Sequence, residues 1–563
     1  MSGTLRVIIV GGVAAGPKAA AKIMRLRPDA QVTLFEKGTD VSYASCGLPY
    51  YVADTIREKK ELLSTASGAL RNPEFFSKVK GFTVHTNTEI TRIDCGAKRV
   101  LAKCIEDEKE EEVWYEYDKL VLATGAAPVI PPIKNVNLQN VFAVKDVNDA
   151  QRIKDCVAEN GPESAVVIGG GLIGLEMTEA LETAEVGVTI VEALPQITNF
   201  LDSDMACLVV KYLDVHGIVV MTDTTVKSLV GKEKVEAVLT DKGEVEADMV
   251  ILATGVKPKV TLAANAGLAI GETGAIKVDD HMRTSDPDIY AAGDCVECIH
   301  IITGGPIYAP LGSTANKQGR VIASNICGIE DFFPGVLGST VCKLFDYNIA
   351  RTGLSESEAL AAGLQVVTAY APGKDHAAYY PEAKMVLMKL VVDANTRKLL
   401  GIQMVGPGEC AKRADVAATA ISAGMTVDQI ASLDLCYAPP YSQALDNIIT
   451  GANIIRNKLA GDMVGITPAE LNEKLERGDN FMLIDNRTPD ENAKGRIQGS
   501  KLIPLGTLRV RLDEVPRDIE VITYCALSLR GYEGARILNG EGYENVKVLD
   551  GGMAMWPYSV ERG

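Results

Sequence analysis

The feature that most constrains the fold is a strand–turn–helix–strand unit that occurs twice, about 158 residues apart. In the first copy an apolar run enters a glycine turn at residues 11–16, and the next apolar run ends at Glu36. In the second copy the turn lies at residues 169–174 and the terminal acid is Glu192. Such glycines let the backbone approach a pyrophosphate at a helix N-terminus, and the acid accepts hydrogen bonds from ribose hydroxyls. The repeat therefore predicts two dinucleotide sites.

The two turns match the Gly-x-Gly-x-x-Gly pattern unequally. Val13 occupies the middle glycine position of the first turn, whereas residues 169–174 fit the pattern completely. Taken alone, the first turn is equally compatible with a βαβ turn that binds no cofactor. Two further matches, Thr124-Gly125 and Thr254-Gly255, each follow an apolar strand and strengthen the repeat. The interpretation that both turns bind cofactors is thus favoured.

Composition excludes several classes of protein. The chain has 563 residues with 57 Lys plus Arg and 74 Asp plus Glu, a net charge of −17. A nucleic-acid partner is disfavoured, because a negative chain repels phosphates unless it carries a concentrated basic stripe. A membrane span is not expected, because the longest uncharged stretch, residues 298–316, is interrupted by glycines and prolines. Twelve scattered cysteines indicate reduced thiols and hence the cytoplasm.

At roughly 150 residues per domain, the length predicts three or four domains. From about residue 335 short strands precede a helical segment, which is typical of an α+β domain. After a linker near residues 458–463, strands and helices alternate within about 100 residues, as in a small α/β domain. The predicted domains are residues 1–117 with 253–330, 118–252, 335–455 and 465–563.

Cys46 is the first candidate for chemistry. It lies ten residues after Glu36, and Pro49 suits the first turn of a helix, so Cys46 would sit near a helix N-terminus. Exposed N–H groups there stabilise a thiolate. The alternative is a buried cysteine that acts as a small apolar residue. Spacing alone favours this alternative.

Together, both turns with their acids, residues 42–46 and residues 284–294 resemble the pyridine nucleotide–disulfide oxidoreductases. Within that family the chain is similar to the single-cysteine branch that contains coenzyme A disulfide reductases. The resemblance covers about residues 5–455, and it implies FAD in the first unit and NADH or NADPH in the second. The residues it assigns to these cofactors are Gly11, Gly16, Glu36, Lys37, Ser42, Thr124, Gly125, Asp294, Gly169, Gly171, Gly174, Glu192 and Gly255.

The resemblance makes Cys46 the redox residue. Ser42 stands at the first position of the family's C-x-x-x-x-C pair, so Cys46 has no local partner. A lone redox sulfur either forms a mixed disulfide with a small thiol or is oxidised to sulfenic acid. Peroxidase and oxidase relatives place a histidine where this chain has Ala14, which counts against peroxide chemistry. Glu192 suits unphosphorylated ribose and would repel a 2′-phosphate, which favours NADH over NADPH.

The last 100 residues resemble a single-domain rhodanese. Cys525 comes directly off a predicted strand and opens a helix, where backbone N–H groups favour a thiolate and then a persulfide. The resemblance makes Cys525 the sulfur carrier and Arg530 an anion contact. Ser528, Gly531 and Arg496 depart from the family pattern and leave the sulfur donor open. A domain that only binds its ligand is the alternative.

Lys18, Lys22 and Arg25 fall on one face of the first predicted helix. Related reductases use basic residues there, so Lys22, Arg25 and Ser42 are candidate ligands of coenzyme A. A solvated helix face is the alternative for any one of the cations.

Tyr379 and Tyr437 are candidate proton donors. The family presents such tyrosines from the neighbouring subunit towards the redox cysteine, where a phenol could protonate a departing thiolate. Tyr380 could replace Tyr379 in that role. A homodimer is expected from the resemblance. We interpret Cys295 and Cys298 as structural, because no second pair completes a metal site.

The sequence thus predicts an α/β protein with two Rossmann-like domains, an α+β dimerisation domain and a C-terminal rhodanese-like domain. The expected function is an FAD-dependent NADH oxidoreductase that reduces coenzyme A disulfide, coenzyme A persulfide or polysulfide through Cys46. Two alternatives remain. One is a flavoprotein that reduces an electron carrier while Cys46 is inert, and the other is a sulfur-binding or sensing role for the last domain.

Overall fold

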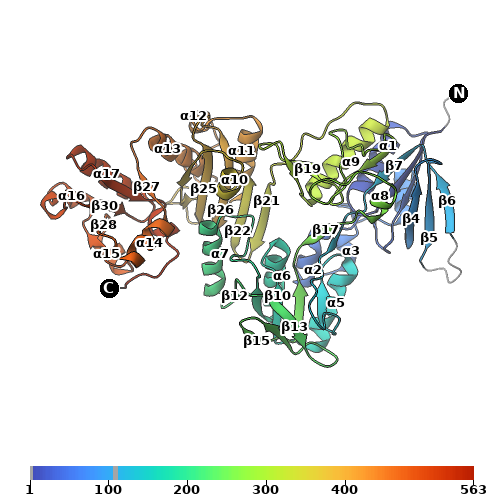
Figure 1. Ribbon diagram of the computed structural model, residues 1–563, viewed down its shortest axis with the longest axis horizontal. Coiled ribbons are helices and arrows are strands. Elements are labelled where there is room, and N and C mark those ends of the chain that lie inside the picture. Colours follow the sequence, from blue (N-terminus) through green and yellow to red (C-terminus); the bar gives the residue numbers. More distant parts are fainter. Residues whose placement is uncertain (1–3, 106–111, 563) are drawn as a thin grey trace. The chain divides into compact units, whose positions relative to one another are not determined.

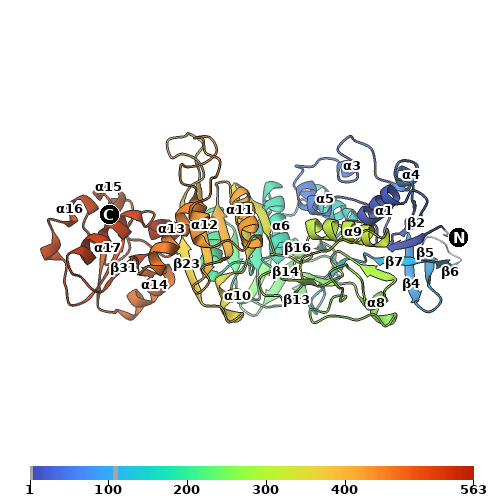
Figure 2. The same ribbon diagram turned by 90° about the horizontal axis from the view of Figure 1, so that it is seen from above.

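The computed structural model describes residues 4–105 and 112–562 (Figures 1 and 2). The sequence also contains an acidic run at residues 108–112, which predicts a solvated turn. Its residues up to Glu111 lie outside the described residues. The chain forms two compact units. Unit 1 comprises Met1–Pro195 and Ile218–Val336, and unit 2 comprises Gln196–Gly217 and Leu337–Gly563. Among the described residues, every helix is too short or too polar to cross a membrane.

Unit 1 contains two parallel sheets that repeat one design. The first has the order β18-β7-β1-β2-β3, with strands Ile289–Ala291, Lys119–Leu122, Arg6–Val10, Gln31–Phe35 and Thr83–His85. Helices α1 (Ala15–Leu26) and α9 (Gly312–Ile326) pack against each other beside it. The four last residues of β1 are buried, because helices or loops cover both faces of a parallel sheet.

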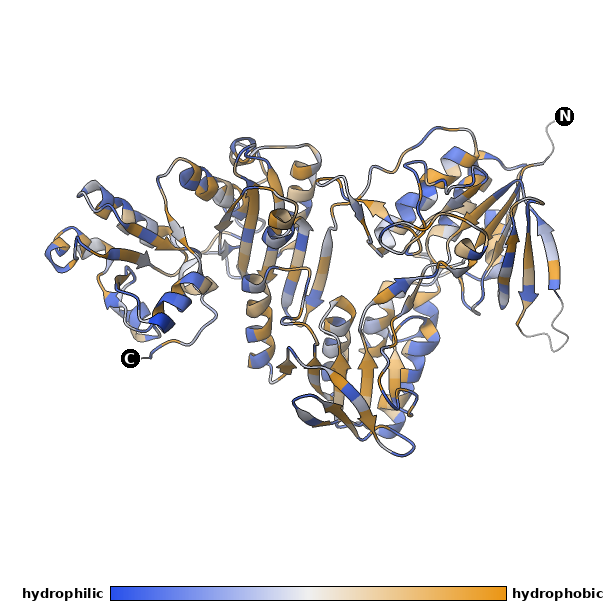
Figure 3. Ribbon diagram, in the orientation of Figure 1, coloured by the Kyte–Doolittle hydropathy of each residue, from blue (hydrophilic) through white to orange (hydrophobic). Residues whose placement is uncertain are grey.

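The second sheet has the order β12-β11-β10-β16-β9. Its strands are Val219–Met221, Gly187–Val191, Ser164–Ile168, Met249–Leu252 and Val141–Ala143, accompanied by helices α5 (Val147–Asn160) and α6 (Leu172–Thr183). These strands are apolar along their length (Figure 3). Strand β7 lies in the first sheet, although the predicted boundary at residue 118 precedes it. The four domain ranges stay predictions.

A two-stranded antiparallel ribbon, β8 (Ala126–Pro128) with β17 (Val256–Pro258), follows the last strand of each half. The Thr124 hydroxyl donates to the Lys259 carbonyl at 2.8 Å, and the Thr254 hydroxyl donates to the Val129 carbonyl at 2.7 Å. The two Thr-Gly pairs thus fasten this ribbon, a structural task that the repeat did not predict.

Unit 1 also has elements without a clear signal in the sequence. Two antiparallel sheets consist of β4 (Thr88–Asp94), β5 (Arg99–Cys104) and β6 (Glu112–Glu116), and of β13 (Val226–Val230), β14 (Ala237–Thr240) and β15 (Gly243–Glu246). The short elements are α2 (Leu48–Val52), α3 (Lys59–Leu62), α4 (Pro73–Phe75), α8 (Thr261–Asn265), β19 (Cys298–Ile299) and β20 (Pro306–Ile307).

The first sheet of unit 2 is antiparallel, with the order β21-β22-β26-β25-β23 and β24 beside β25. Its strands are Thr340–Leu344, Tyr347–Gly353, Leu399–Gly406, Met385–Asp393, Val366–Tyr370 and Gly373–Lys374. The helices are α10 (Glu356–Ala361), α11 (Ala411–Ser422), α12 (Val427–Ala431) and α13 (Asn447–Leu459). Helix α7 (Ser203–Val215), which lies between β11 and β12 in the sequence, packs on β26.

The second sheet of unit 2 is parallel, with the order β27-β31-β30-β28-β29. Its strands are Gly465–Ile466, Val546–Leu549, Glu520–Tyr524, Phe481–Asp485 and Lys501–Leu502. Its helices are α14 (Pro468–Arg477), α15 (Pro489–Ala493), α16 (Leu505–Leu508) and α17 (Leu529–Gly540). This small domain has the predicted alternation of strands and helices.

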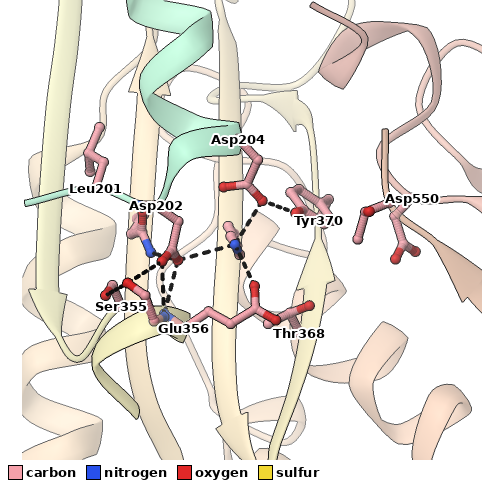
Figure 4. A network of polar contacts seen from close by, with 12 residues as sticks. Leu201, Asp202, Asp204, Ser355, Glu356, Thr368, Tyr370 and Asp550 are labelled. Carbon is pink, nitrogen blue, oxygen red and sulfur yellow. Dashed lines mark hydrogen bonds and ion pairs between the residues drawn. The ribbon is translucent and has the colours of Figure 1, made fainter. Parts of the chain in front are cut away.

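A buried ion network joins α7 to the antiparallel sheet (Figure 4). The Nζ atom of Lys389, on β25, lies 2.7 Å from an Asp204 oxygen, 2.8 Å from Glu356 and 3.1 Å from Asp202. Asp204 also accepts a hydrogen bond from the Tyr370 hydroxyl. Burial alone would lower the pKa of Lys389, but the three carboxylates raise it. Lys389 is therefore a permanent cation at the junction.

A second ion pair joins two helices of the small parallel domain. The Arg530 guanidinium, on α17, donates two hydrogen bonds of 2.7 Å to the carboxylate of Glu491, on α15. Together with the Thr488 cap, Arg530 lowers the pKa of Glu491 to about 2. Because this folded-state pKa lies below the ordinary value of 4.5, the pair contributes stability above about pH 4.5 and loses it as the pH falls towards 2.

We expect Lys389→Met to destabilise unit 2 by about 3–5 kcal/mol, because it leaves three clustered carboxylates without their buried cation. Calorimetry of the full chain should show a lowered transition. The matched control is Lys384→Met, which changes an exposed lysine just before the same strand and should leave that transition in place. Equal transitions in the two variants would contradict the stabilising role of the network.

We expect Glu491→Gln to flatten the pH dependence of unfolding of the small parallel domain between about pH 4.5 and pH 2. Trp556 is buried in that domain, so its fluorescence reports unfolding there when Trp114 is replaced by Phe. Asp490→Asn, which removes an exposed neighbouring carboxylate, is the control and should keep the wild-type slope. An unchanged slope in Glu491→Gln would show that its pKa is not depressed by the pair.

Candidate active site

In the first glycine turn, the backbone lies so close to neighbouring backbone that a side chain would not fit at two of its glycines. Gly11 has φ +110°, and a Cβ atom there would collide with the Ala123 carbonyl. A Cβ atom on Gly16 would collide with the Gly11 carbonyl. Among the described residues, no side chain caps the start of α1 and its first turn carries no acid. Its N–H groups thus fit the pyrophosphate of a dinucleotide such as FAD.

The second turn repeats this geometry. Gly169 has φ +109°, and a Cβ atom there would collide with the Ala253 carbonyl, as one on Gly174 would with the Gly169 carbonyl. Gly171 precedes α6, whose start lacks a side-chain cap within the described part of the chain. By contrast, α5, α10, α12 and α14 each carry a capping box of their own side chains. The donor groups of α6 fit a second dinucleotide phosphate.

The terminal acids occupy equivalent positions. Glu36 accepts hydrogen bonds from the N–H groups of Gly12, at 2.6 Å, and Gly38, at 2.7 Å. Glu192 accepts from the N–H groups of Gly170 and Leu194, both at 2.9 Å. Each carboxylate therefore braces its own glycine turn, a role that adds to the predicted contact with ribose. Contact with ribose stays a prediction.

The other predicted cofactor residues differ in surroundings. Ser42, with φ +53°, donates its N–H to the Gly12 carbonyl at 2.7 Å, which places it beside the first turn. Lys37 is exposed and pairs with Glu89 at 2.9 Å. Burial raises the pKa of Asp294, whereas Lys145 opposes this rise. Gly125 and Gly255 have positive φ values of 69° and 94° at the start of the ribbon.

Cys46 is exposed and lies next to two helix starts. A short 3₁₀ turn, Ser45–Gly47, carries it into α2, and Pro49 lies in the first turn of that helix as predicted. A Cβ atom on Gly312, the first residue of α9, would lie 3.9 Å from the Cys46 Sγ atom. The described residues provide no side-chain cap for α9. The alternative of a buried structural cysteine is therefore wrong.

Two basic residues of α1 have different surroundings: Lys22 contacts α9, whereas Arg25 is exposed. The Lys22 Nζ atom donates to the Arg320 carbonyl at 3.0 Å and to the Ser324 hydroxyl, and it lies 3.7 Å from Asp331. Lys22 thus links α1 to α9, and it could bind coenzyme A only if these contacts broke. Arg25 is exposed in the last turn of α1. Binding of coenzyme A by either residue stays a prediction.

Tyr379 and Tyr437 lie together in unit 2. Their side chains hydrogen-bond each other, which raises the pKa of Tyr379. Both rings are exposed, at 76% and 51% of their surface. Tyr380 instead stacks on His376, with ring centroids 6.0 Å apart. The predicted tyrosine pair is thus assembled within one chain, and the proposed substitute for Tyr379 is engaged elsewhere.

Cys525 lies in the loop between β30 and α17 and is only 2% exposed. The Met553 N–H donates to its carbonyl at 2.9 Å, and the Ala554 N–H donates to the Ala526 carbonyl at 3.0 Å. Arg530 hydrogen-bonds the Cys525 side chain as well as Glu491. A thiolate or persulfide on Cys525 would therefore face a fixed cation.

Three departures from the rhodanese pattern have physical reasons. Ser528 keeps a glycine-like φ of +80°, and its hydroxyl donates to the Leu549 carbonyl at 3.1 Å. A Cβ atom on Gly531 would lie 3.1 Å from the Tyr524 Cα atom, so α17 packs closely on β30. Arg496 pairs with Glu561 at 3.1 Å.

Three titratable side chains, Glu176, Lys145 and Glu491, were not predicted from the sequence. Burial raises the pKa of Glu176, on α6, to about 7, and burial with the neighbouring Lys259 lowers the pKa of Lys145 to about 8. Glu491, which orients Arg530, was also missed. An acid five residues into an uncapped helix could have drawn attention to Glu176, but no spacing reveals Lys145 or Glu491, because their partners are distant in sequence.

Cys295 and Cys298 do not share a partner. The Cys295 thiol donates to the Ala292 carbonyl at 3.3 Å, and burial raises its pKa. The Gln318 amide donates to the Cys298 sulfur at 3.3 Å, and burial raises the pKa of Cys298 to about 11. Both thiols are buried. This environment agrees with a structural role.

Comparison with known proteins identifies three family models along the chain. Residues 5–319 match the pyridine nucleotide-disulphide oxidoreductase family, and residues 339–449 match its dimerisation domain. Residues 467–557 match the rhodanese-like domain. The predicted combination of two Rossmann-like domains, a dimerisation domain and a rhodanese-like domain is therefore confirmed.

Similar proteins extend over most of the chain. The NAD(P)H sulfur oxidoreductase (CoA-dependent) of Pyrococcus abyssi is 41% identical over 451 residues, which are 80% of this chain and 98% of that protein. The structure of an NAD-dependent persulfide reductase from A. fulgidus is 44% identical with a TM-score of 0.94, covering 98% of this chain and 100% of that one.

A third similar protein also matches almost the whole chain. The structure of reduced Bacillus anthracis CoADR-RHD is 37% identical with a TM-score of 0.92, covering 99% of this chain and 98% of that one. FAD and NADH or NADPH are the cofactors of the family. From residue 5 to residue 449, the chain belongs to the pyridine nucleotide-disulphide oxidoreductase family, and a rhodanese-like domain follows.

Proposed function

We propose that this protein is an NADH-dependent flavoprotein that reduces coenzyme A disulfide, coenzyme A persulfide or polysulfide through Cys46. The observation that carries the proposal is the exposed Cys46 thiol at the start of α9, with Ser42 in place of a second cysteine. The relatives support it, since two are named as CoA-dependent or persulfide-reducing enzymes. A reductase of an electron carrier would leave this thiol without a task.

Two groups of residues would hold the cofactors. The turn of Gly11 and Gly16, with Glu36 and Asp294, would hold FAD, and the turn of Gly169 and its neighbours, with Glu192, would hold NADH. Bound FAD supplies two-electron transfer from NADH to the sulfur at Cys46. The protein contributes the uncapped starts of α1 and α6 for the phosphates, and it places Cys46 beside the start of α9.

Cys46 performs the sulfur chemistry. Its thiolate attacks one sulfur of coenzyme A disulfide, which forms a mixed disulfide and releases one coenzyme A thiolate. With coenzyme A persulfide, attack at the inner sulfur releases hydrosulfide and forms the same mixed disulfide. Two electrons from NADH and one proton then split the mixed disulfide, restore the Cys46 thiolate and release coenzyme A as a thiol.

The tyrosine pair would supply that proton in a homodimer. Tyr379 and Tyr437 are exposed and hydrogen-bonded to each other, so one phenol can donate while the other stabilises the result. The match to a dimerisation domain supports a homodimer in which the pair of one subunit serves Cys46 of the other. We also propose that the enzyme works in the cytoplasm, where its thiols stay reduced.

The rhodanese-like domain would handle sulfane sulfur. The Cys525 thiolate attacks the outer sulfur of a persulfide or polysulfide donor, takes that sulfur as a cysteine persulfide, and the donor leaves with the bonding electron pair. Arg530, fixed by Glu491, would neutralise the anionic persulfide. A domain that only binds its ligand would not need a buried cysteine against a fixed cation.

We expect Cys46→Ser to abolish NADH-dependent reduction of coenzyme A disulfide, because the serine hydroxyl cannot form the mixed disulfide. Anaerobic NADH oxidation measures this. Cys525→Ser is the matched control: it should keep the rate with coenzyme A disulfide and lose persulfide formation on the last domain. Wild-type turnover by Cys46→Ser would contradict reduction through Cys46. Unchanged sulfur transfer by Cys525→Ser would contradict the proposed sulfur-carrier role of the rhodanese-like domain.

We expect the enzyme to use NADH with a kcat/KM at least about tenfold above that for NADPH, since Glu192 repels a 2′-phosphate. Glu192→Gln should narrow this ratio, because it removes the negative charge and keeps an oxygen that accepts a backbone N–H. Steady-state kinetics with both nucleotides at a fixed disulfide concentration decide the point. A preference for NADPH in the wild type would show that Glu192 does not select the nucleotide.

A further inference from the structure

A buried ion pair connects the rhodanese-like domain to the dimerisation domain. The Nζ atom of Lys458, near the end of α13, lies 2.6 Å from an Asp550 carboxylate oxygen. The same atom donates to the Thr368 carbonyl, on β23, at 2.9 Å. The exposed fractions of the two charged side chains are 11% and 4%. Lys458 therefore joins two sheets of unit 2 through one buried cation.

Asp550 directly precedes the turn that supports the Cys525 loop. Asp550 follows β31, and Gly551 and Gly552 continue with φ +73° and +57°. A Cβ atom on Gly552 would collide with the Cys525 carbonyl, so the backbone of this turn lies against the loop. The Met553 N–H, one residue later, binds the same carbonyl. The position of Asp550 thus sets the surface on which the Cys525 loop rests.

The packing around the pair leaves little freedom. A Cβ atom on Gly465 would lie 2.5 Å from an Asp550 oxygen and 2.7 Å from the Lys458 Nζ atom. A Cβ atom on Gly551 would lie 3.2 Å from the Tyr370 Cβ atom, and Asp550 lies beside Tyr370 in Figure 4. The Asp550 N–H also donates to the Ile466 carbonyl at 2.9 Å. Lys458 is therefore held against Asp550 in one geometry.

We propose that Lys458 is a positioning residue for sulfur transfer: its ion pair with Asp550 fixes the Gly551–Gly552 turn and so holds the Cys525 loop in its reactive form. The inference rests on the proposed sulfur-carrier role of Cys525. It makes the dimerisation domain a structural part of the sulfurtransferase site, because the cation that orders the loop comes from α13. Lys458 does not touch the sulfur.

The experiment measures persulfide formation on Cys525 in the full-length protein. Inorganic polysulfide is the donor, and mass spectrometry of the Cys525 peptide gives the rate at each concentration. We expect Lys458→Met to lower the saturating rate about ten- to hundredfold, the effect of a small misplacement of reacting groups. The half-saturating polysulfide concentration should stay unchanged, since Lys458 does not contact the donor. Lys458→Arg, which keeps the cation, should recover most of the rate.

Two further variants separate positioning from stability. Lys458→Met with Asp550→Asn removes both charges, so it should regain thermal stability while the rate stays low. Arg536→Gln breaks a different contact between this domain and the linker, the pair with Asp462, and should keep the wild-type rate. Wild-type rates in Lys458→Met, or in the double variant, would overturn the inference. If wild-type Cys525 forms no persulfide, the proposed sulfur-carrier function fails instead.

Discussion

The fold of unit 1 depends on two glycine turns, at each of which the backbone lies in close contact with the backbone of a neighbouring strand. At Gly11 and at Gly169 a side chain would strike the carbonyl of the neighbouring strand, so each helix start is drawn against the end of its sheet. That proximity directs uncapped N–H groups to the edge where parallel strands end. The acids Glu36 and Glu192 then lock the turns. The residues that we propose to bind phosphate thus also pack each turn against its sheet.

Much of this could be predicted because it is local. The sequence predicts strands at residues 31–35, 520–524 and 546–549 and a helix at residues 468–477. Strands β2, β30 and β31 and helix α14 have these bounds. What escaped prediction depends on distant partners. Lys389 draws its carboxylates from α7 and α10, and Glu491 meets Arg530 across 39 residues. Ser528, one of the three departures from the rhodanese pattern, adopts a positive φ of the kind that glycine favours.

The two cysteines to which we assign sulfur chemistry have opposite environments. Cys46 is exposed at the start of a long helix, as suits a sulfur that must exchange bulky thiols. Cys525 is buried under a glycine turn and faces an arginine, as suits a small anionic sulfur that must be shielded. The neighbours in sequence predict a helix start beside each cysteine, but they do not predict that Cys46 is exposed and Cys525 is buried. For Cys46 the neighbouring helix start comes from residue 312, far along the chain.

Helix α7 has a consequence for how this protein can be divided. Its residues interrupt the second sheet of unit 1 in sequence, yet they complete the core of unit 2. The polypeptide therefore passes between the units three times, near residues 195, 217 and 336. A fragment that starts at Leu337 would lack Asp202 and Asp204. It would retain Lys389 with only Glu356 of its three carboxylate partners. Neither unit is a contiguous piece of chain, so gene fusion or fission at a single site cannot exchange one without damaging the other.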